Sequence, residues 1–480
     1  MFTASGFSGW TLLLKDVTMK ILLVVYDNES YIHYFPVGLA YIAAVLKREG
    51  YHVDIYNQDK EHYPDEHLTY FLDNNHYDII GISVIGGYYQ YRKLLGLSRA
   101  INNSKKRPFY IIGGHGPSPE PAYFLKKTQG DAIVLGEGEV TVVELVNAVA
   151  DKKPLIGVPG VAFREGDRVT INEKRPLIVD IDSISWPAYE LFPIEYYRLM
   201  RDPHTSVTDF VMPVLSGRGC IFRCNFCYRM DEGFRPRSSE PIIEEIKFLQ
   251  DKYHITYIEF ADELLMSSIG RTTELCNSFL EADLKFKWFC NGRLNFAKPE
   301  VLKLMKRAGC VFINYGIEAM DDQILKNMNK SLTTGIIREG IEATLNAAIS
   351  PGFNIIFGNI GENKETLEKG VDFLLKYDDG SQRRTIRPVT PYPGSPIYYY
   401  AIEKGLLVDC ADFYENKHVN SDLLSVNFTE LTDDEFHQAL LEANSRLLQN
   451  YYQKRLEDVS RQMFNLYVNK DSSFRGFRQI

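Results

Sequence analysis

The sequence predicts an α/β protein in which two domains of alternating strands and helices follow one another. Short apolar runs alternate with amphipathic stretches over residues 19–150, and a second alternating pattern covers residues 206–420. Each pattern is typical of a parallel sheet covered by helices. The chain has 480 residues, 45% of them hydrophobic, which is enough for two or three sizeable domain cores.

The first domain, residues 19–150, is predicted to be a five-stranded parallel sheet with helices on both faces. Buried strands are expected at residues 21–26, 53–56, 79–84, 109–112 and 132–135. Helices are expected at residues 37–49, 67–74, 90–101, 122–127 and 141–150. This alternation favours a doubly wound, Rossmann-like domain.

Four polar loops, three of them rich in glycine, follow strands of this sheet, and ligands of doubly wound sheets bind at the carboxyl ends of the strands. We therefore expect a sizeable ligand there. A nicotinamide cofactor is disfavoured because its G-x-G-x-x-G signature follows the first strand, whereas the nearest match here follows the fifth and has Thr141 in place of the third glycine. Alternatively, the glycines only end helices and form turns. The candidate ligand-binding residues are Ser83, Gly113, Gly114, His115, Gly136, Glu137 and Gly138.

Three further segments flank the two domains. Residues 1–18 are assigned as an extension without function, because a cleaner strand begins at Met19. Residues 151–205 are predicted to form a hairpin, over residues 161–171, and a linker. Residues 421–480 are assigned as a helical cap, which either covers the mouth of the second domain or packs against it as a helix pair.

The second domain, residues 206–420, is predicted to be an open barrel of six strand–helix units. Its first strand, residues 211–215, leads into a cysteine-rich loop, and a helix at residues 240–252 returns the chain. Further strands are expected within residues 257–263, 287–293, 310–321 and 354–362, and the sixth unit contains residues 390–396.

The most informative feature of the chain is the C-x3-C-x2-C run of Cys220, Cys224 and Cys227. Three thiolates this close can bind one corner of a cuboidal iron–sulfur cluster, which usually has four cysteine ligands. One iron would then be left open. Glycines beside the run permit a tight loop, and neighbouring arginines place positive charge where thiolates must form.

Other uses of the cysteines are disfavoured. A zinc site needs a fourth ligand, yet no Cys or His follows the run until His254. A disulfide framework is disfavoured by the odd number of cysteines, seven, and by the lack of a secretory signal, so we expect a reducing, cytoplasmic compartment. The remaining cysteines form no compact ligand run and are predicted to be buried packing residues; they are Cys276, Cys290, Cys310 and Cys410.

The charge distribution disfavours nucleic acid as a partner. The formal net charge is -9, from 63 acidic and 54 basic residues, and no basic block is present. Arg229, Arg235 and Arg237 follow the cysteine run, where they either meet an anionic substrate or are solvated or structural. No apolar stretch reaches the roughly 20 residues of a membrane span.

The cysteine run, with Phe226 and Tyr228 on either side of the third cysteine, resembles the signature of the radical S-adenosylmethionine (SAM) superfamily. In that family the open iron is chelated by SAM, whose cleavage gives a 5′-deoxyadenosyl radical. The resemblance implies a [4Fe–4S] cluster on the three cysteines, SAM as a cofactor, and an external electron donor of the flavodoxin or ferredoxin type.

The later barrel segments resemble the same family and imply further SAM contacts. Asp262 or Glu263 would accept hydrogen bonds from the SAM amino group, although such acids can also be a favourable helix N-terminal charge. Arg293 would pair with the carboxylate of SAM. The remaining SAM-binding candidates by resemblance are Phe226, Glu318 for a ribose hydroxyl, and Asn354 at the start of the adenine-side segment.

Residues 36–46, 112–115 and 135–139 resemble the cobalamin-binding domain that is fused to B12-dependent radical SAM enzymes. Many cobalamin proteins carry an Asp-x-His-x-x-Gly loop whose histidine ligates cobalt. Here Asp27 is followed by Asn28 and Glu29, and His33 has the wrong spacing. The resemblance therefore implies cobalamin bound without a protein imidazole.

The two adjacent signatures together imply an enzyme that methylates an unactivated carbon of a small-molecule substrate, with methylcobalamin as the methyl donor. One alternative is an oxidative cyclase or ring-rearranging enzyme on the same scaffold. Others are a radical SAM enzyme with a vestigial cobalamin domain and an unreactive scaffold protein. No sequence feature identifies the substrate or a catalytic residue.

Overall fold

The first domain is a doubly wound sheet, as predicted, in a computed structural model that describes residues 19–30, 34–202, 204–230 and 232–473. The predicted extension, residues 1–18, lies outside the described residues. The strand order is β2-β1-β3-β4-β5-β6-β7. The parallel strands are β1 (Lys20–Val25), β2 (His52–Asn57), β3 (Ile79–Ser83), β4 (Phe109–Gly113) and β5 (Ala132–Val134).

The predicted hairpin, β6 (Val161–Glu165) and β7 (Arg168–Ile171), joins this sheet instead of standing apart in the linker. It pairs antiparallel to β5 and extends the sheet by two strands. Three short helical turns form the rest of the linker: η1 (Ile181–Ser183), η2 (Tyr189–Leu191) and α7 (Ile194–Tyr197).

Alternating residues of β1 enter two different cores, which explains why its whole sequence is apolar. Leu23 packs in one core with the helices over residues 37–48 and 138–150, and Leu22 packs in the other with the helices over residues 65–74, 88–103 and 121–128. The helices of the first domain are α1 (Val37–Arg48), α2 (Gln58–Glu61), α3 (Asp65–Asn74), α4 (Tyr88–Asn103), α5 (Pro121–Thr128) and α6 (Gly138–Ala150).

The second domain is an open barrel of six parallel strands in the order β15-β14-β13-β12-β11-β8, as predicted. The strands are β8 (Val211–Val214), β11 (Tyr257–Phe260), β12 (Lys287–Gly292), β13 (Cys310–Glu318), β14 (Ser350–Phe357) and β15 (Arg387–Pro388). The helical segments around them are α8 (Ser239–Tyr253), α9 (Ile269–Glu281), η3 (Leu294–Phe296), α10 (Pro299–Arg307), α11 (Asp322–Asn327), α12 (Thr334–Asn346), α13 (Lys364–Tyr377), α14 (Pro396–Glu403), α15 (Cys410–Asp412) and the π-helical η4 (Phe413–Lys417).

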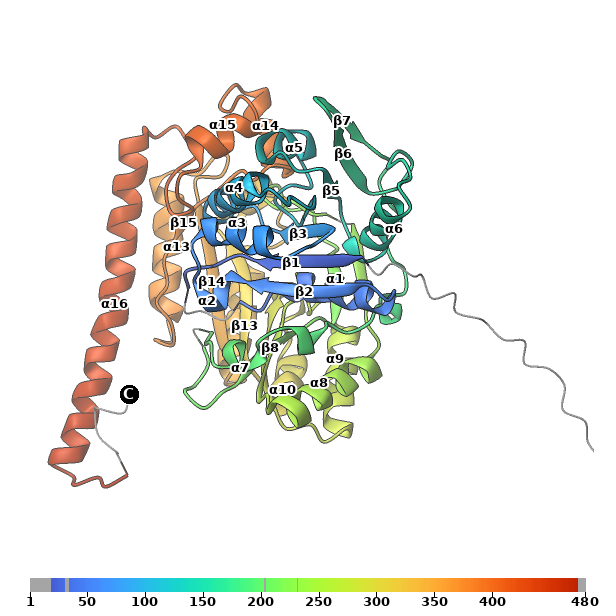
Figure 1. The fold of residues 1–480 in the computed structure, drawn as a ribbon. Coiled ribbons are helices and arrows are strands. Elements are labelled where there is room, and N and C mark those ends of the chain that lie inside the picture. The colour runs from blue at the N-terminus through green and yellow to red at the C-terminus, as the bar shows by residue number, and fades with distance from the viewer. Residues whose placement is uncertain (1–18, 31–33, 203, 231, 474–480) are drawn as a thin grey trace, which may run out of the picture.

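A separate two-stranded sheet, β9 (Gly217–Cys220) and β10 (Gly233–Pro236), brackets the cysteine loop. After the barrel, α16 (Asp433–Tyr467) is one continuous helix of 35 residues that begins with a capping box between Thr432 and Glu435. It runs along the outside of α13 (Figure 1). Near its start, Phe436 stacks on Phe357 at the end of β14, with 4.7 Å between the ring centres. None of the described helices combines the length and apolar character needed to cross a lipid bilayer.

Candidate active site

A cavity of about 300 Å³ lies at the carboxyl edge of the first sheet, where the two domains meet. Loops after β3, β4 and β5 form one wall, and Leu215, Arg218, Met230, Ala261 and Glu263 of the second domain form the other. The structure therefore brings all seven ligand-binding candidates of the first domain into one space: Ser83, Gly113, Gly114, His115, Gly136, Glu137 and Gly138.

The cavity extends between the sheet and α1 because glycines leave space there. A Cβ atom on Gly81 would lie 2.9 Å from Leu23, and one on Gly138 would lie 2.8 Å from Ile42. Gly114 has a φ of +98°, and a Cβ there would lie 2.3 Å from the carbonyl oxygen of Val84. The inner walls are apolar, so the cavity suits a ligand with a flat apolar part and polar groups near the loops.

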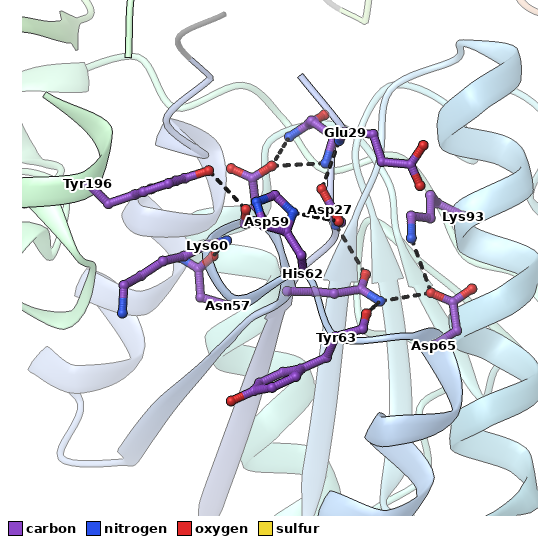
Figure 2. Close-up of polar contacts among 12 residues, drawn as sticks. Asp27, Glu29, Asn57, Asp59, Lys60, His62, Tyr63, Asp65, Lys93 and Tyr196 are labelled. Atoms are coloured by element: carbon purple, nitrogen blue, oxygen red, sulfur yellow. Dashed lines mark hydrogen bonds and ion pairs between the residues drawn. The ribbon is translucent and has the colours of Figure 1, made fainter. Parts of the chain in front are cut away.

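At the carboxyl end of β1, a dense polar network holds the chain in place (Figure 2). Asp27 accepts a hydrogen bond from the Glu29 backbone N–H at 2.8 Å and contacts His62 Nδ1 at 2.9 Å. Asp59 accepts from the backbone and side chain of Asn28. Asp27 thus pairs with a histidine from the end of α2, and Glu29 occupies the position at which an Asp-x-His-x-x-Gly motif would have its histidine. His33 lies outside the described residues.

The three cysteines of the run lie in the loop that starts at the end of β9. Cys224 is buried, Cys220 is half-buried and Cys227 is exposed. Within the described part of the chain, no three His, Cys, Asp or Glu side chains are arranged to hold a single metal ion. In a cuboidal cluster each thiolate binds a different iron, so the three cysteines need not converge on one metal ion.

Two cations lie beside the cysteine loop. Arg293 Nη1 is 3.9 Å from Cys224 Sγ, and the Arg293 guanidinium stacks on Phe222. A hydrogen bond with Cys227, the charge of nearby Lys330 and that of Arg293 lower the pKa of the Cys224 thiol to about 6. Arg293 is only 6% exposed, and its Nη2 has no hydrogen-bond partner among the described residues, so this buried donor can receive an anionic ligand.

The two acids that follow β11 have different surroundings. Asp262 is fully buried, accepts from the Ser216 backbone N–H at 2.7 Å and also bonds the Ser216 hydroxyl. Burial raises the pKa of Asp262 to about 7. Glu263 lines the cavity and accepts from the Gly219 backbone N–H at 3.0 Å. Asp262 therefore supports the chain before the cysteines, and Glu263 is the acid that faces ligand space.

Glu318 at the end of β13 is buried and pairs with Lys330 at 2.8 Å. Its φ of +69° is uncommon for a residue other than glycine, and such conformations gather at functional sites. The Lys330 ammonium also lies 5.6 Å from the ring centre of Phe226 in the cysteine loop. Two of the predicted SAM contacts, Glu318 and Phe226, are therefore joined through Lys330, to which the sequence analysis gave no role.

Asn354 belongs to a chain of asparagines that crosses three barrel strands. Asn354 donates to Asn314 at 2.9 Å, Asn314 donates to Asn291 at 3.1 Å, and Asn291 donates to the Asp262 carbonyl at 2.8 Å. Sequence reasoning found Asn354 by resemblance and missed the other two. Asn291 and Asn314 could have been found from the strand register, because they lie opposite each other in the parallel strands β12 and β13.

Arg235 is structural, one of the alternatives left open by the sequence, since its guanidinium bonds Glu137 across the domain boundary. Arg237 is likewise buried against Glu245. The four cysteines outside the run are buried and unpaired, as predicted: Cys276, Cys290, Cys310 and Cys410.

Comparison with known protein families gives two matches, one for each domain. The family described as the B12 binding domain matches residues 24–146, and the radical SAM superfamily matches residues 214–374. The first match contains the glycine-rich loops of the cavity, and the second contains the cysteine run.

Curated relatives cover most of the chain. An uncharacterized methyltransferase, PH0819, of Pyrococcus horikoshii is 30% identical over 401 residues, which are 81% of this chain and 84% of the relative. The cytidylyl-2-hydroxyethylphosphonate methyltransferase of Streptomyces wedmorensis is 25% identical over 78% of this chain and 79% of its own. An anaerobic magnesium-protoporphyrin IX monomethyl ester cyclase of Rubrivivax gelatinosus is 26% identical over 79% of this chain and 68% of its own.

Solved structures share the two-domain fold. The radical SAM methyltransferase TsrM from Kitasatospora setae, solved with cobalamin and a [4Fe–4S] cluster, superposes with a TM-score of 0.72 at 16% identity, over 90% of this chain and 89% of its own. The cobalamin-dependent radical SAM enzyme OxsB superposes with a TM-score of 0.64 at 18% identity, over 90% of this chain and 56% of its own.

Proposed function

Because this chain belongs to the radical SAM enzymes that carry a B12-binding domain, whose cofactors are a [4Fe–4S] cluster, SAM and cobalamin, we propose that it methylates an unactivated carbon of a small-molecule substrate. The observation that carries this proposal is the shared cavity. Its walls combine the glycine-rich loops of the B12-binding domain with Arg218 and Glu263, which lie beside the cysteine loop. A ligand bound in this cavity would lie close to the segment that leads into the cysteine loop.

The residues of the chain fit these groups. The deep apolar part of the cavity, opened by Gly81 and Gly138, suits the flat base of cobalamin, and the polar loops suit its amide groups. The unpartnered Nη2 of Arg293 suits the carboxylate of SAM. When bound, the cluster and SAM supply the 5′-deoxyadenosyl radical, and methylcobalamin supplies the methyl group.

The protein contributes binding, orientation and exclusion of water. Cys220, Cys224 and Cys227 are the proposed cluster ligands, and Arg293 and Lys330 offset the negative charge of their thiolates. Glu263 is the proposed acceptor for the SAM amino group and Glu318 for a ribose hydroxyl. Phe226, Asp262 and Asn354 complete the proposed SAM site, Asp262 by supporting the backbone before the cysteines.

We also propose Ser83, Gly113, Gly114, His115, Gly136, Glu137 and Gly138 as the cobalamin-binding residues. His115 meets Tyr228, the residue after Cys227, edge to face at 6.3 Å between ring centres. This contact places a side chain of the proposed cobalamin site against the cysteine loop. The electron that starts turnover would come from a separate low-potential donor, of flavodoxin or ferredoxin type.

The experiment uses anaerobically reconstituted protein with cobalamin, a chemical low-potential reductant, SAM labelled in its methyl group and fractionated cell extract. We expect transfer of the label to a small molecule, with formation of both 5′-deoxyadenosine and S-adenosylhomocysteine. Formation of 5′-deoxyadenosine without S-adenosylhomocysteine in the presence of cobalamin would contradict methyl transfer.

A second candidate function is oxidative cyclisation, because a cyclase stands among the relatives that cover three quarters of this chain. The mass of the product separates the two functions. Methylation adds one methylene unit to the substrate, whereas oxidative cyclisation removes hydrogen atoms. A protein that cleaves SAM but gives no cobalamin spectrum would instead have a vestigial B12-binding domain.

A further inference from the structure

The cavity and the cysteine loop are joined by four charged side chains, Glu137, Glu139, Arg218 and Arg235, which we call the Glu–Arg bridge. Arg218 donates to Glu137 at 2.9 Å and to Glu139 at 2.5 Å. Arg235 donates to the second carboxylate oxygen of Glu137 at 2.9 Å. Both glutamates lie at the start of α6 in the first domain and both arginines in β9 and β10, so every contact of the bridge crosses the domain boundary.

The two arginines hold the two ends of the cysteine loop. β9 ends at Cys220, and Arg218 lies directly opposite Arg235 in the antiparallel pair of β9 and β10. Opposite residues in such a pair project from the same face, which explains how both guanidinium groups reach the same carboxylate. The chain between these strands carries Cys224 and Cys227, so the bridge restrains the loop at both of its ends.

The bridge is buried and balanced in charge. Each of its four side chains is at most 16% exposed, and two positive charges meet two negative charges. The linker adds two bonds, because Ile178 N–H donates to Glu137 at 2.9 Å and its carbonyl accepts from Arg235 at 2.6 Å. Buried, hydrogen-bonded ion pairs of this kind are directional and leave a costly unpaired charge when one partner is removed.

The two glutamates of the bridge contact the arginines and also face the cavity. Glu137 and Glu139 both line the cavity. Glu139 is 7% exposed, and its buried Oε2 has no hydrogen-bond partner in the part of the chain that the structure describes. This oxygen is therefore an acceptor for an N–H group of a ligand at the cavity wall.

We propose that the Glu–Arg bridge positions the cysteine loop from the cavity side, so that cobalamin binding and an ordered, cluster-loaded cysteine loop stabilise each other. This inference rests on the proposed function, because it takes cobalamin as the occupant of the cavity. A bound cobalamin restrains residues 136–139, and the bridge passes this restraint to β9 and β10. The coupling is reciprocal, since linkage requires each ligand to raise the affinity of the other by the same factor.

The test compares cobalamin affinity in cluster-free protein and in protein reconstituted with cluster and SAM, by titration of the visible cobalamin spectrum. For the unaltered protein we expect cobalamin to bind about fivefold or more tightly once cluster and SAM are present. Arg235 does not line the cavity. In the Arg235→Met variant the coupling factor, which is the ratio of the two cobalamin affinities with and without cluster and SAM, should therefore fall toward one.

Glu144→Gln is the matched control. Glu144 lies on α6, the same helix as Glu139, and accepts from Arg175 Nη1 at 3.1 Å without contact to the cysteine loop. This variant should keep the full coupling factor. Equal loss of coupling in Glu144→Gln and Arg235→Met would overturn the proposal, as would full coupling in Arg235→Met.

A second measurement needs no variant and decides the question if Arg235→Met does not fold. Arg223, in the cysteine loop, has a side chain that is 69% exposed and is a site for trypsin. Cobalamin added to the cluster-free, unaltered protein should slow cleavage after Arg223, and an unchanged rate would overturn the proposal. Cobalamin binding without coupling would refute the bridge and leave the proposed function intact, whereas absence of cobalamin binding would refute both.

Discussion

The Arg293 guanidinium lies 3.3 Å from the centre of the Phe222 ring, so an arginine from the end of β12 stacks on an aromatic side chain inside the cysteine loop. This contact holds a planar, permanently charged group beside Cys224 and leaves Nη2 as a buried donor that meets no partner within residues 19–30, 34–202, 204–230 and 232–473. A lysine could supply the charge, but it could supply neither the stacking nor the fork of donors.

Arg293→Lys should therefore weaken SAM binding about tenfold to a hundredfold, because one charge-assisted hydrogen bond contributes about 1.5–3 kcal/mol. The measurement is calorimetric titration of cluster-loaded protein with SAM. Arg271→Lys is the control, since Arg271 donates to the Arg237 carbonyl at 2.6 Å in a structural contact. Equal SAM affinity in Arg293→Lys and the unaltered protein would exclude Arg293 as the carboxylate partner.

Cys224→Ala should abolish the iron–sulfur cluster, because two cysteines of the run cannot replace the third ligand. Iron and sulfide analysis after anaerobic reconstitution measures this directly. Cys276→Ala is the matched control, since Cys276 is also buried but lies on α9 outside the run. It should retain the cluster and lose about 1 kcal/mol of stability from the small cavity that it creates. A full cluster in Cys224→Ala would refute the proposed ligand set.

Gly114→Ala should weaken cobalamin binding about tenfold or more, because the new Cβ would lie 2.3 Å from the Val84 carbonyl oxygen at a φ that disfavours alanine. The loop must move, and it forms part of the cavity wall. We expect the change in a spectral titration with cobalamin, together with a loss of about 1–3 kcal/mol in stability. Gly113→Ala tests whether the clash causes the loss of stability, since a Cβ at Gly113 would meet no described atom within 4 Å. This variant should keep the stability of the unaltered protein to within about 0.5 kcal/mol.

Asp262 gives the stability of the protein a specific pH dependence. Its carboxyl group has a pKa of about 7 in the folded protein, raised by burial from an ordinary value of 3.8. Between these values the folded state binds more protons than the unfolded state, so stability should fall as pH rises from about 4 to 7. The effect is on the order of 4 kcal/mol, at about 1.4 kcal/mol for each pH unit.

Asp262→Asn should flatten this part of the pH profile, which urea unfolding at several pH values measures through the transition midpoint. Glu362 is a useful comparison. It does not line the cavity, and burial raises its pKa to about 8. Glu362→Gln should flatten a range that extends about one pH unit higher. An unchanged slope in Asp262→Asn would show that its carboxyl group ionises at its ordinary pKa.

The fold was predictable from the sequence because its signals are local. Buried parallel strands are short apolar runs, and most of the predicted runs coincide with strands to within a few residues. The exceptions depend on which strands pair and which helices continue, and no local pattern decides this. The hairpin of β6 and β7 was expected in the linker, but its place is decided by the free edge of β5, which no local pattern reports. Similarly, α16 is a single helix where one alternative was a helix pair.

The candidate site was predictable where it follows motifs and not where it depends on contacts between distant segments. The glycine-rich loops and the cysteine run could be named because their chemistry requires particular residues at particular spacings. Lys330 and Glu139 lie in segments that resemble the family but were given no role from the sequence, and Asn291 and Asn314 carry no such spacing. The contacts of these four residues became visible only when neighbouring strands and loops placed them beside the predicted residues.

The amino-acid sequence by itself determined the two α/β domains, the three thiols and the glycine-rich edge, because each depends on residues close together in the chain. Tertiary structure alone decided that one cavity serves both domains and that Glu137 meets Arg218 and Arg235, which are 81 and 98 residues away. The physical reason is that an ion pair between separate domains depends on how their surfaces pack, and packing is a property of the whole folded chain.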